Sequence, residues 1–178
     1  LAQEAVLPLW ERTRRFRIYN PRLIPGPVQS REYVRAILAA TRTGRQIGTD
    51  DVDAAVEVRM AKQHVVHEGD HRFAIVLEES VLRYPIGGVD TMAAQLGHLL
   101  TVSSLPSVSL GIIPLGADRS RMWPAEGFWM FDDAKVSVEL VSGHLNITQP
   151  HEIAMYAKVF GELARLAVRG PEARTLIT

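Results

Sequence analysis

Apolar residues recur at helical spacing in five segments of the chain. A spacing of three and four residues places them on one face of a helix, so each segment is predicted to be helical. The helices are expected at residues 1–13, 31–43, 50–68, 90–103 and 150–169. Pro8 is expected to shorten the first helix, Asp90 to cap the fourth, and Gly170-Pro171 to end the last one.

Unbroken or alternating apolar runs predict the strands. They are expected at residues 16–19, 73–77, 108–115, 128–131, 136–141 and 144–147, with Ser142-Gly143 as a two-residue hairpin turn. Residues 1–178 are therefore predicted to form a single α+β domain. It has N-terminal helices, a mixed sheet that ends in an antiparallel meander, and a closing C-terminal helix.

A tight turn precedes the second helix, within Leu23–Tyr33. In Pro25-Gly26-Pro27, the prolines fix the backbone dihedral φ and the glycine can adopt conformations closed to other residues. Ser30 can cap the helix that follows, because its hydroxyl can accept a hydrogen bond from a free backbone N–H. Gln29 and Tyr33 are the side chains of this turn best suited to face a pocket.

The chain has 178 residues, with 20 basic and 20 acidic side chains, so its formal net charge is zero. Nucleic-acid-binding domains usually carry a basic excess, so direct nucleic-acid binding by this chain is not expected. The absence of cysteine excludes disulfides, thiol catalysis and cysteine-ligated zinc. No apolar run approaches the roughly 18 residues of a membrane span, so no membrane partner is expected and the cytoplasm is the default location.

His67-Glu68-Gly69-Asp70-His71 matches the zinc-protease pattern H-E-x-x-H. That chemistry requires both histidines on one face of a continuous helix. Gly69-Asp70 lies where the helix should end before the strand at Phe73, so we predict no metal site. No other motif indicates a cofactor, and no pattern identifies catalytic residues.

The aromatic residues Trp123, Phe128, Trp129 and Phe131 are concentrated near a long loop at residues 116–126. They are either core residues or the wall of an apolar pocket that this loop covers. Arg59 lies on an apolar helix face, where an unpaired charge is costly, so it either forms a buried ion pair or holds an anionic group in a pocket. The predicted ligand-binding residues are Gln29, Tyr33, Arg59, Glu78, Met122, Trp123, Phe128 and Trp129.

The order of several short motifs resembles the C-terminal domain, formally of unknown function, of actinobacterial antitoxin-like helix-turn-helix regulators. That family has an apolar-Pro-Gly-Leu-Leu-Gln-Thr-x-x-Tyr signature, an Arg-x-x-Arg-Gln helix motif, a strand ending in Glu-x-x-Leu-Arg, and a Gln-Leu-x-x-Leu motif. The corresponding segments here are Ile24–Tyr33, Arg59–Gln63, Leu77–Arg83 and Gln95–Leu99, followed by the Pro114 strand, Gly127-Phe128 and Val138-Glu139. Pro27-Val28 replaces Leu-Leu, and Lys62 replaces the second arginine.

The resemblance implies an effector domain that binds a small apolar molecule or a small partner protein, as a homodimer, and acts on a DNA-binding domain elsewhere. The family's helix-turn-helix is not in this chain, which is therefore either part of a regulator or a stand-alone copy with another use. The alternative is an enzyme, such as a cyclase acting on an apolar metabolite in natural-product biosynthesis, because such catalysis can rest on shape and orientation. A deep pocket walled by both Trp123 and Trp129 would favour the enzyme.

Overall fold

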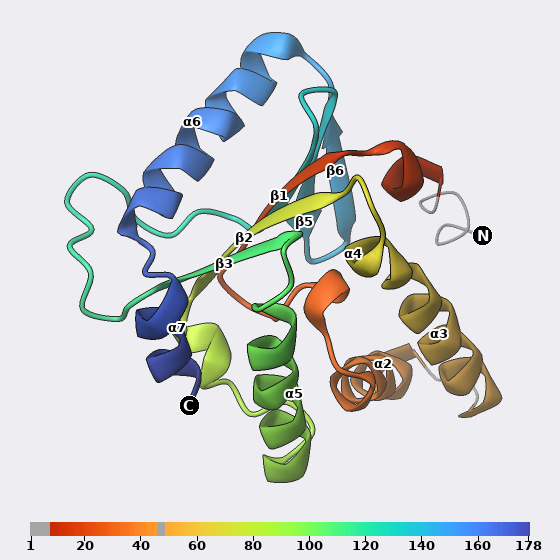
Figure 1. Ribbon diagram of the computed structural model, residues 1–178. Coiled ribbons are helices and arrows are strands. Elements are labelled where there is room, and N and C mark those ends of the chain that lie inside the picture. The colour runs from red at the N-terminus through yellow and green to blue at the C-terminus, as the bar shows by residue number, and fades with distance from the viewer. Residues whose placement is uncertain (1–7, 46–48) are drawn as a thin grey trace.

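The computed structural model describes residues 8–45 and 49–178, which form a six-stranded mixed sheet with helices on both faces (Figure 1). The strands are β1 (Arg15–Asn20), β2 (Arg72–Glu78), β3 (Val108–Ile113), β4 (Phe128–Phe131), β5 (Lys135–Leu140) and β6 (Gly143–Ile147). Their order across the sheet is β3-β2-β1-β4-β5-β6. The first three run parallel, and β4, β5 and β6 add an antiparallel meander to β1.

The helices are divided between the two faces of the sheet. They are α2 (Arg31–Arg45), α3 (Thr49–Lys62), α4 (His64–His67), α5 (Val89–Val102), α6 (Pro150–Leu166) and α7 (Gly170–Ile177), with 3-10 turns η1 (Gly26–Val28) and η2 (Glu79–Leu82). Figure 1 shows α6 alone on one face and α2, α3 and α5 on the other. Residues 8–12 are also helical.

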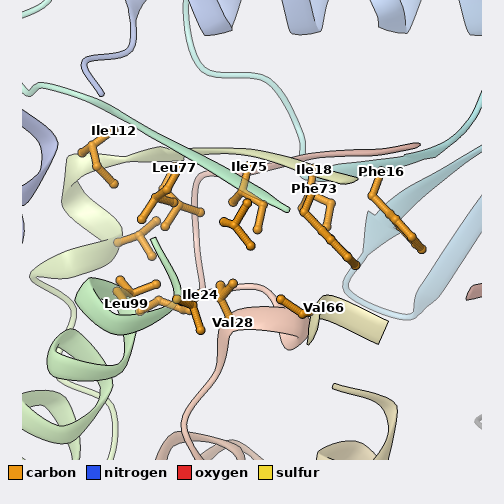
Figure 2. Close-up of a cluster of buried hydrophobic side chains, with 14 of the residues drawn as sticks. Phe16, Ile18, Ile24, Val28, Val66, Phe73, Ile75, Leu77, Leu99 and Ile112 are labelled. Atoms are coloured by element: carbon orange, nitrogen blue, oxygen red, sulfur yellow. The ribbon is translucent and has the colours of Figure 1, made fainter. Parts of the chain in front are cut away.

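The larger core fills the space between the sheet and the helices α4, α5 and α7 together with η1 (Figure 2). Residues alternate along each strand, so Phe16 and Ile18 of β1 face this core while Tyr19 faces away from it. The rings of Phe16 and Phe73 stack across β1 and β2, with centroids 4.4 Å apart. The turn at η1 contributes Ile24 and Val28, so it is part of the core.

A second core lies between the opposite face of the sheet and α6. Tyr19, Phe128 and Val136 enter it from three strands, and Ile153 and Phe160 enter it from α6. The chain between β3 and β4 covers the same face, because Ala117, Met122 and Ala125 pack against this cluster. The sheet is therefore buried on both faces over its central strands, as the apolar run in β2 predicts.

The predicted α+β class, mixed sheet, antiparallel meander and C-terminal helix are confirmed. The strand expected at residues 16–19 is β1, and the short helix α7 after α6 is an additional element. Ser30 caps α2 as expected: its Oγ accepts a hydrogen bond from the backbone N–H of Tyr33 at 3.2 Å. The first predicted helix lies partly outside the described residues, and so does the gap between the helices expected at 31–43 and 50–68.

Three local predictions were wrong. Gly170-Pro171 does not end the last helix but begins α7, because Gly170 takes φ of 58° and Pro171 occupies the first turn. Asp90 lies in the first turn of α5, and Gly88 is the capping residue. The hairpin turn is shifted by one residue, since Leu140 pairs with Gly143 and leaves Val141-Ser142 as the turn.

Candidate functional site

An open cleft of about 630 Å³ lies beside the meander, on the sheet face opposite α6. One wall is the surface of β4, β5 and β6, and the other is made by residues 8–12, the chain around η1, and the helices α2 and α3. The sheet wall includes Trp129, Phe131, Lys135, Ser137, Glu139, His144 and Asn146. The opposite wall includes Leu9, Trp10, Arg22, Leu23, Gly26, Gln29, Ile37, Arg59 and Lys62. This volume is in the range of small-molecule sites in proteins.

The charged side chains of the cleft are mostly cationic. Four of them are basic, Arg22, Arg59, Lys62 and Lys135, and one is acidic, Glu139. Glu139 is already engaged, because it lies 3.7 Å from Arg22 and accepts a hydrogen bond from the Asn20 amide at 3.2 Å. The cleft therefore has a local excess of positive charge in a chain whose formal net charge is zero.

Arg59 and Lys62 occupy the last turn of α3, three residues apart and so on one face of the helix. Within the described residues neither side chain pairs with a carboxylate. Burial lowers the pKa of Arg59, and burial followed by the charge of Arg59 lowers the pKa of Lys62. Both side chains are thus partly desolvated cations, a state that a bound anion would relieve.

Aromatic rings form the apolar part of the cleft. Trp10 and Trp129 pack with their centroids 5.1 Å apart, and Trp129 packs on Phe131 at 5.9 Å. The Lys62 ammonium lies over Trp10, and the Lys135 ammonium lies over Phe131, each 5.8 Å from the ring centroid. These cation–π contacts keep the two ammonium groups at the cleft surface without neutralising their charge.

The turn at η1 is fastened to its surroundings by glutamine side chains. Gln95 of α5 donates to the carbonyl oxygen of Val28 at 2.9 Å and accepts from the Ser30 N–H at 2.7 Å. Gln63, just after α3, donates to the carbonyl oxygens of Gly26 and Gln29 at 3.0 and 2.7 Å. The glutamines in two separate sequence motifs therefore converge on the proline-rich turn.

Gln29, the residue after η1, makes a hydrogen bond with only one of its two side-chain polar atoms. Its side-chain nitrogen donates to the carbonyl oxygen of Ile24 at 2.7 Å, whereas its Oε1 is buried without a hydrogen-bond partner. Only 5% of Gln29 is exposed, and the residue lines the cleft. A buried acceptor without a donor is costly, so a hydrogen-bond donor brought to Oε1 would stabilise this part of the turn.

Three of the predicted site residues, Gln29, Arg59 and Trp129, meet in this cleft. Arg59 is not in the ion pair considered for it, within the part of the chain that the structure describes. Tyr33 lies behind the cleft: it is 1% exposed, and its hydroxyl accepts the Ile24 N–H at 3.2 Å. Tyr33 is therefore a structural residue of the turn.

The other predicted residues lie elsewhere, and of the two alternatives for the aromatic residues Phe128 is a core residue. Phe128 is adjacent to Trp129 on β4 and so points to the α6 side, where Met122 packs against the same cluster. Trp123 is 65% exposed and does not line the cleft. The loop at residues 116–126 covers the α6 face and not a pocket at Trp129.

Glu78 is buried on the α6 side as part of a satisfied network. It accepts a hydrogen bond from Tyr19 at 2.7 Å, and Arg119 donates to both of its oxygens at 2.8 and 3.0 Å. Burial, followed by the hydrogen bond to Glu78, raises the pKa of Tyr19 well above its ordinary value. Since Arg119 also donates to the carbonyl oxygen of Met122, this network fastens the loop to the sheet.

The H-E-x-x-H segment does not have the geometry of a zinc protease. Helix α4 ends at His67, and Glu68 is extended with φ of −106°. His71 turns away and contacts the carbonyl oxygen of Thr13 through Nδ1 at 2.6 Å. No group of three or more histidine, aspartate or glutamate side chains suited to a metal ion occurs within residues 8–45 and 49–178.

The comparison with protein families gives a match over nearly the whole chain. Residues 4–178 match the model described as "Domain of unknown function (DUF5753)". The chain belongs to the DUF5753 family. The match covers the cleft and both cores of this DUF5753 domain. A search of curated proteins found no match to it.

Among solved structures, the DUF5753 domain is similar to TrmBL2, an archaeal chromatin protein whose structure is described as showing a novel mode of DNA binding. The two are 11% identical, with a TM-score of 0.47, over 95% of this chain and 51% of that protein. The chain thus spans about half the length of TrmBL2. Within the described residues, no helix of the DUF5753 domain has the length and apolar character needed to cross a membrane.

Proposed function

We propose that this chain is the effector domain of a transcriptional regulator and that its ligand, a small molecule, binds in the cleft beside the meander. The observation that carries the proposal is the cleft itself. Its volume suits a small molecule, Trp129 and Phe131 give it an apolar surface, and Arg59, Lys62 and Gln29 give it polar groups without full partners. The zero net charge supports a role other than direct binding of nucleic acid.

The regulatory part of the proposal is supported by the motif order described above. The motif residues Tyr33, Gln63 and Gln95 all contact the η1 turn, and Gln29 in that turn lines the cleft. A ligand in the cleft would therefore contact an element that is tied to α2, α3 and α5. In a regulator, such a connection could pass a change at the cleft to an attached DNA-binding domain.

Binding in the cleft can be tested with N-phenyl-1-naphthylamine, a neutral aromatic dye whose emission rises in apolar surroundings. We expect the wild-type chain to enhance its emission saturably and the Trp129→Ala variant to lose the enhancement. Trp123→Ala is the matched control, because Trp123 is exposed and lies outside the cleft. Absence of saturable binding, or equal loss in both variants, would contradict the proposed site.

The proposal includes self-association as a homodimer. Strand β6 is at one end of the sheet, and the hairpin beside it exposes Leu140, Val141 and Leu145 by 47%, 96% and 51%. An exposed strand edge with apolar residues is suited to pairing with a second copy. Sedimentation equilibrium of wild type and of a Val141→Lys/Leu145→Lys variant tests this: the wild type should be dimeric and the variant monomeric. Identical masses for the two would contradict it.

The second candidate is a stand-alone enzyme, such as a cyclase for an apolar metabolite. It is favoured by Glu139 and His144, which pair across β5 and β6 and place a carboxylate and an imidazole on the cleft wall. Against it, Trp123 and Trp129 do not wall one pocket. The reading frame upstream of Leu1 discriminates the two: an encoded helix-turn-helix supports the regulator, and a start codon near Leu1 beside biosynthetic genes supports the enzyme.

A further inference from the structure

Lysine is rare in this chain, and most of its lysines lie in the cleft. Only three of its 20 basic residues are lysines, and two of them, Lys62 and Lys135, line the cleft. Each holds its ammonium group over an aromatic ring, and neither pairs with a carboxylate in the described part of the chain. The flexible lysine stem lets such a group leave the ring and follow a negatively charged ligand.

Arg59 adds a third cation to the cleft, on the same wall as Lys62. It is half-buried, and within residues 8–45 and 49–178 no carboxylate, carbonyl oxygen or ring serves as its partner. Other arginines of this part of the molecule do have carboxylate partners: Arg31 pairs with Glu57, and Arg35 pairs with Asp53. The unpaired state of Arg59 is therefore a local property of the cleft and does not reflect a shortage of acidic residues nearby.

Gln29 is an independent sign that the cleft is a binding site. Its Oε1 is buried, lacks a donor, and belongs to a residue that is 5% exposed and lines the same cleft as Arg59 and Lys62. The apolar rings of Trp129 and Phe131 lie on the opposite wall. A ligand that matches these groups carries a negative charge for Arg59 and Lys62, a hydrogen-bond donor for Gln29 Oε1, and an apolar, preferably planar, body for the rings.

We propose that the cleft selects an amphipathic organic anion. Its carboxylate, sulfonate or phosphate group lies between Arg59 and Lys62, and its apolar body lies on Trp129. This inference rests on the proposed function and adds the chemical class of the ligand. Arginine and lysine donate charge-assisted hydrogen bonds to such oxygens, and the desolvated surroundings make these bonds stronger than they would be in water.

The test compares two dyes that share one aromatic body. Anilinonaphthalene-8-sulfonate carries a sulfonate, whereas N-phenyl-1-naphthylamine is its neutral counterpart. A net charge-assisted hydrogen bond contributes about 1.5–3 kcal/mol, so we expect the wild-type chain to bind the sulfonate at least about tenfold more tightly than the neutral dye. This comparison needs no variant, so it does not depend on the folding of a mutated chain.

The Arg59→Met/Lys62→Met variant should lose about tenfold or more in affinity for the sulfonate and less than about twofold for the neutral dye. Arg72→Met/Lys158→Met, which removes the same charge outside the cleft, should change neither affinity. Equal affinity of the wild type for both dyes, or equal effects of the two double variants, would overturn the anion inference. If the neutral dye still binds and Trp129→Ala still abolishes its binding, the proposed function stands. Failure of both dyes to bind would overturn both proposals.

Discussion

Replacing Gln95 with methionine tests how the turn before α2 is held in place. Gln95 is fully buried, and its amide pairs with the Ser30 N–H at 2.7 Å and the Val28 carbonyl oxygen at 2.9 Å. Ser30 is 5% exposed and Val28 is not exposed at all. Methionine has nearly the same length and volume but cannot pair with either backbone group, so the variant leaves a donor and an acceptor buried without partners.

The expected loss follows from these two groups. Each buried unsatisfied polar group costs about 1–3 kcal/mol, so the pair costs about 2–6 kcal/mol. Burying the more apolar methionine side chain offsets about 1 kcal/mol of this. We therefore expect the free energy of unfolding to fall by about 3 kcal/mol, a large share of the 5–15 kcal/mol that usually separates folded from unfolded domains.

Urea unfolding, followed by far-ultraviolet circular dichroism, measures this loss. With a slope of about 2 kcal/mol per molar urea, the midpoint should fall by about 1.5 M. Gln149→Met is the matched control, because Gln149 is exposed and its side chain makes no capping hydrogen bond, so a change within about 0.5 kcal/mol is expected. A loss below about 1 kcal/mol for Gln95→Met would refute the argument that this amide secures the turn.

Three further changes probe other parts of the fold. Phe73→Ala empties a buried ring site in the larger core and should lower the free energy of unfolding by about 3–5 kcal/mol in urea titrations; a loss near that of a surface change would contradict the packing. Gly87→Ala should cost about 1–3 kcal/mol, because Gly87 has φ of 76° and a Cβ there would lie 2.7 Å from the Cβ of Ala36; an unchanged melting temperature would contradict this. Burial, followed by the hydrogen bond to Glu126, raises the pKa of Tyr156 to about 12. A raised pKa favours the protonated phenol in the folded state, so this stabilisation is present below the ordinary tyrosine pKa of about 10 and is lost as the pH rises towards 12. At about pH 11 the wild type and Tyr156→Phe should therefore differ little in tyrosinate absorbance at 295 nm, and a difference of one full tyrosinate would contradict the shift.

Much of the fold could be predicted because burial leaves a simple trace in the sequence. The unbroken apolar run in β2 requires cover on both faces, and the regular apolar spacing in α6 requires one buried face. Element ends were harder to predict because one residue pair can serve opposite purposes. Gly170-Pro171 can stop a helix or start one, and only the packing of Ala173 and Ile177 against the core selects the second.

Part of the candidate site could be predicted because polar residues in apolar segments are conspicuous in the sequence. Arg59 and Gln29 stand out because they are polar residues in apolar surroundings, and both line the cleft. Trp129 also lines it, whereas Phe128 next to it does not, because neighbours on a strand face opposite ways. The alternation along the strand places these two residues on opposite faces of the sheet, but it does not predict which face carries a cleft. Lys62 and Lys135 line the same cleft because distant segments of the chain pack together. No local sequence pattern predicts that packing.

The position of β1 in the sheet has a consequence for how the chain folds. It precedes every other strand of this chain in sequence, yet Phe16 pairs with Phe73 in β2 on one side and with Phe131 in β4 on the other. Its central place is therefore complete only after most of the chain has left the ribosome, and pairing between such distant segments is slow. A chain interrupted before Phe131 would leave one edge of this apolar strand unpaired, a surface prone to aggregation. The domain should thus depend on late, cooperative folding, and shortened products should be captured by chaperones or degraded before they reach a native form.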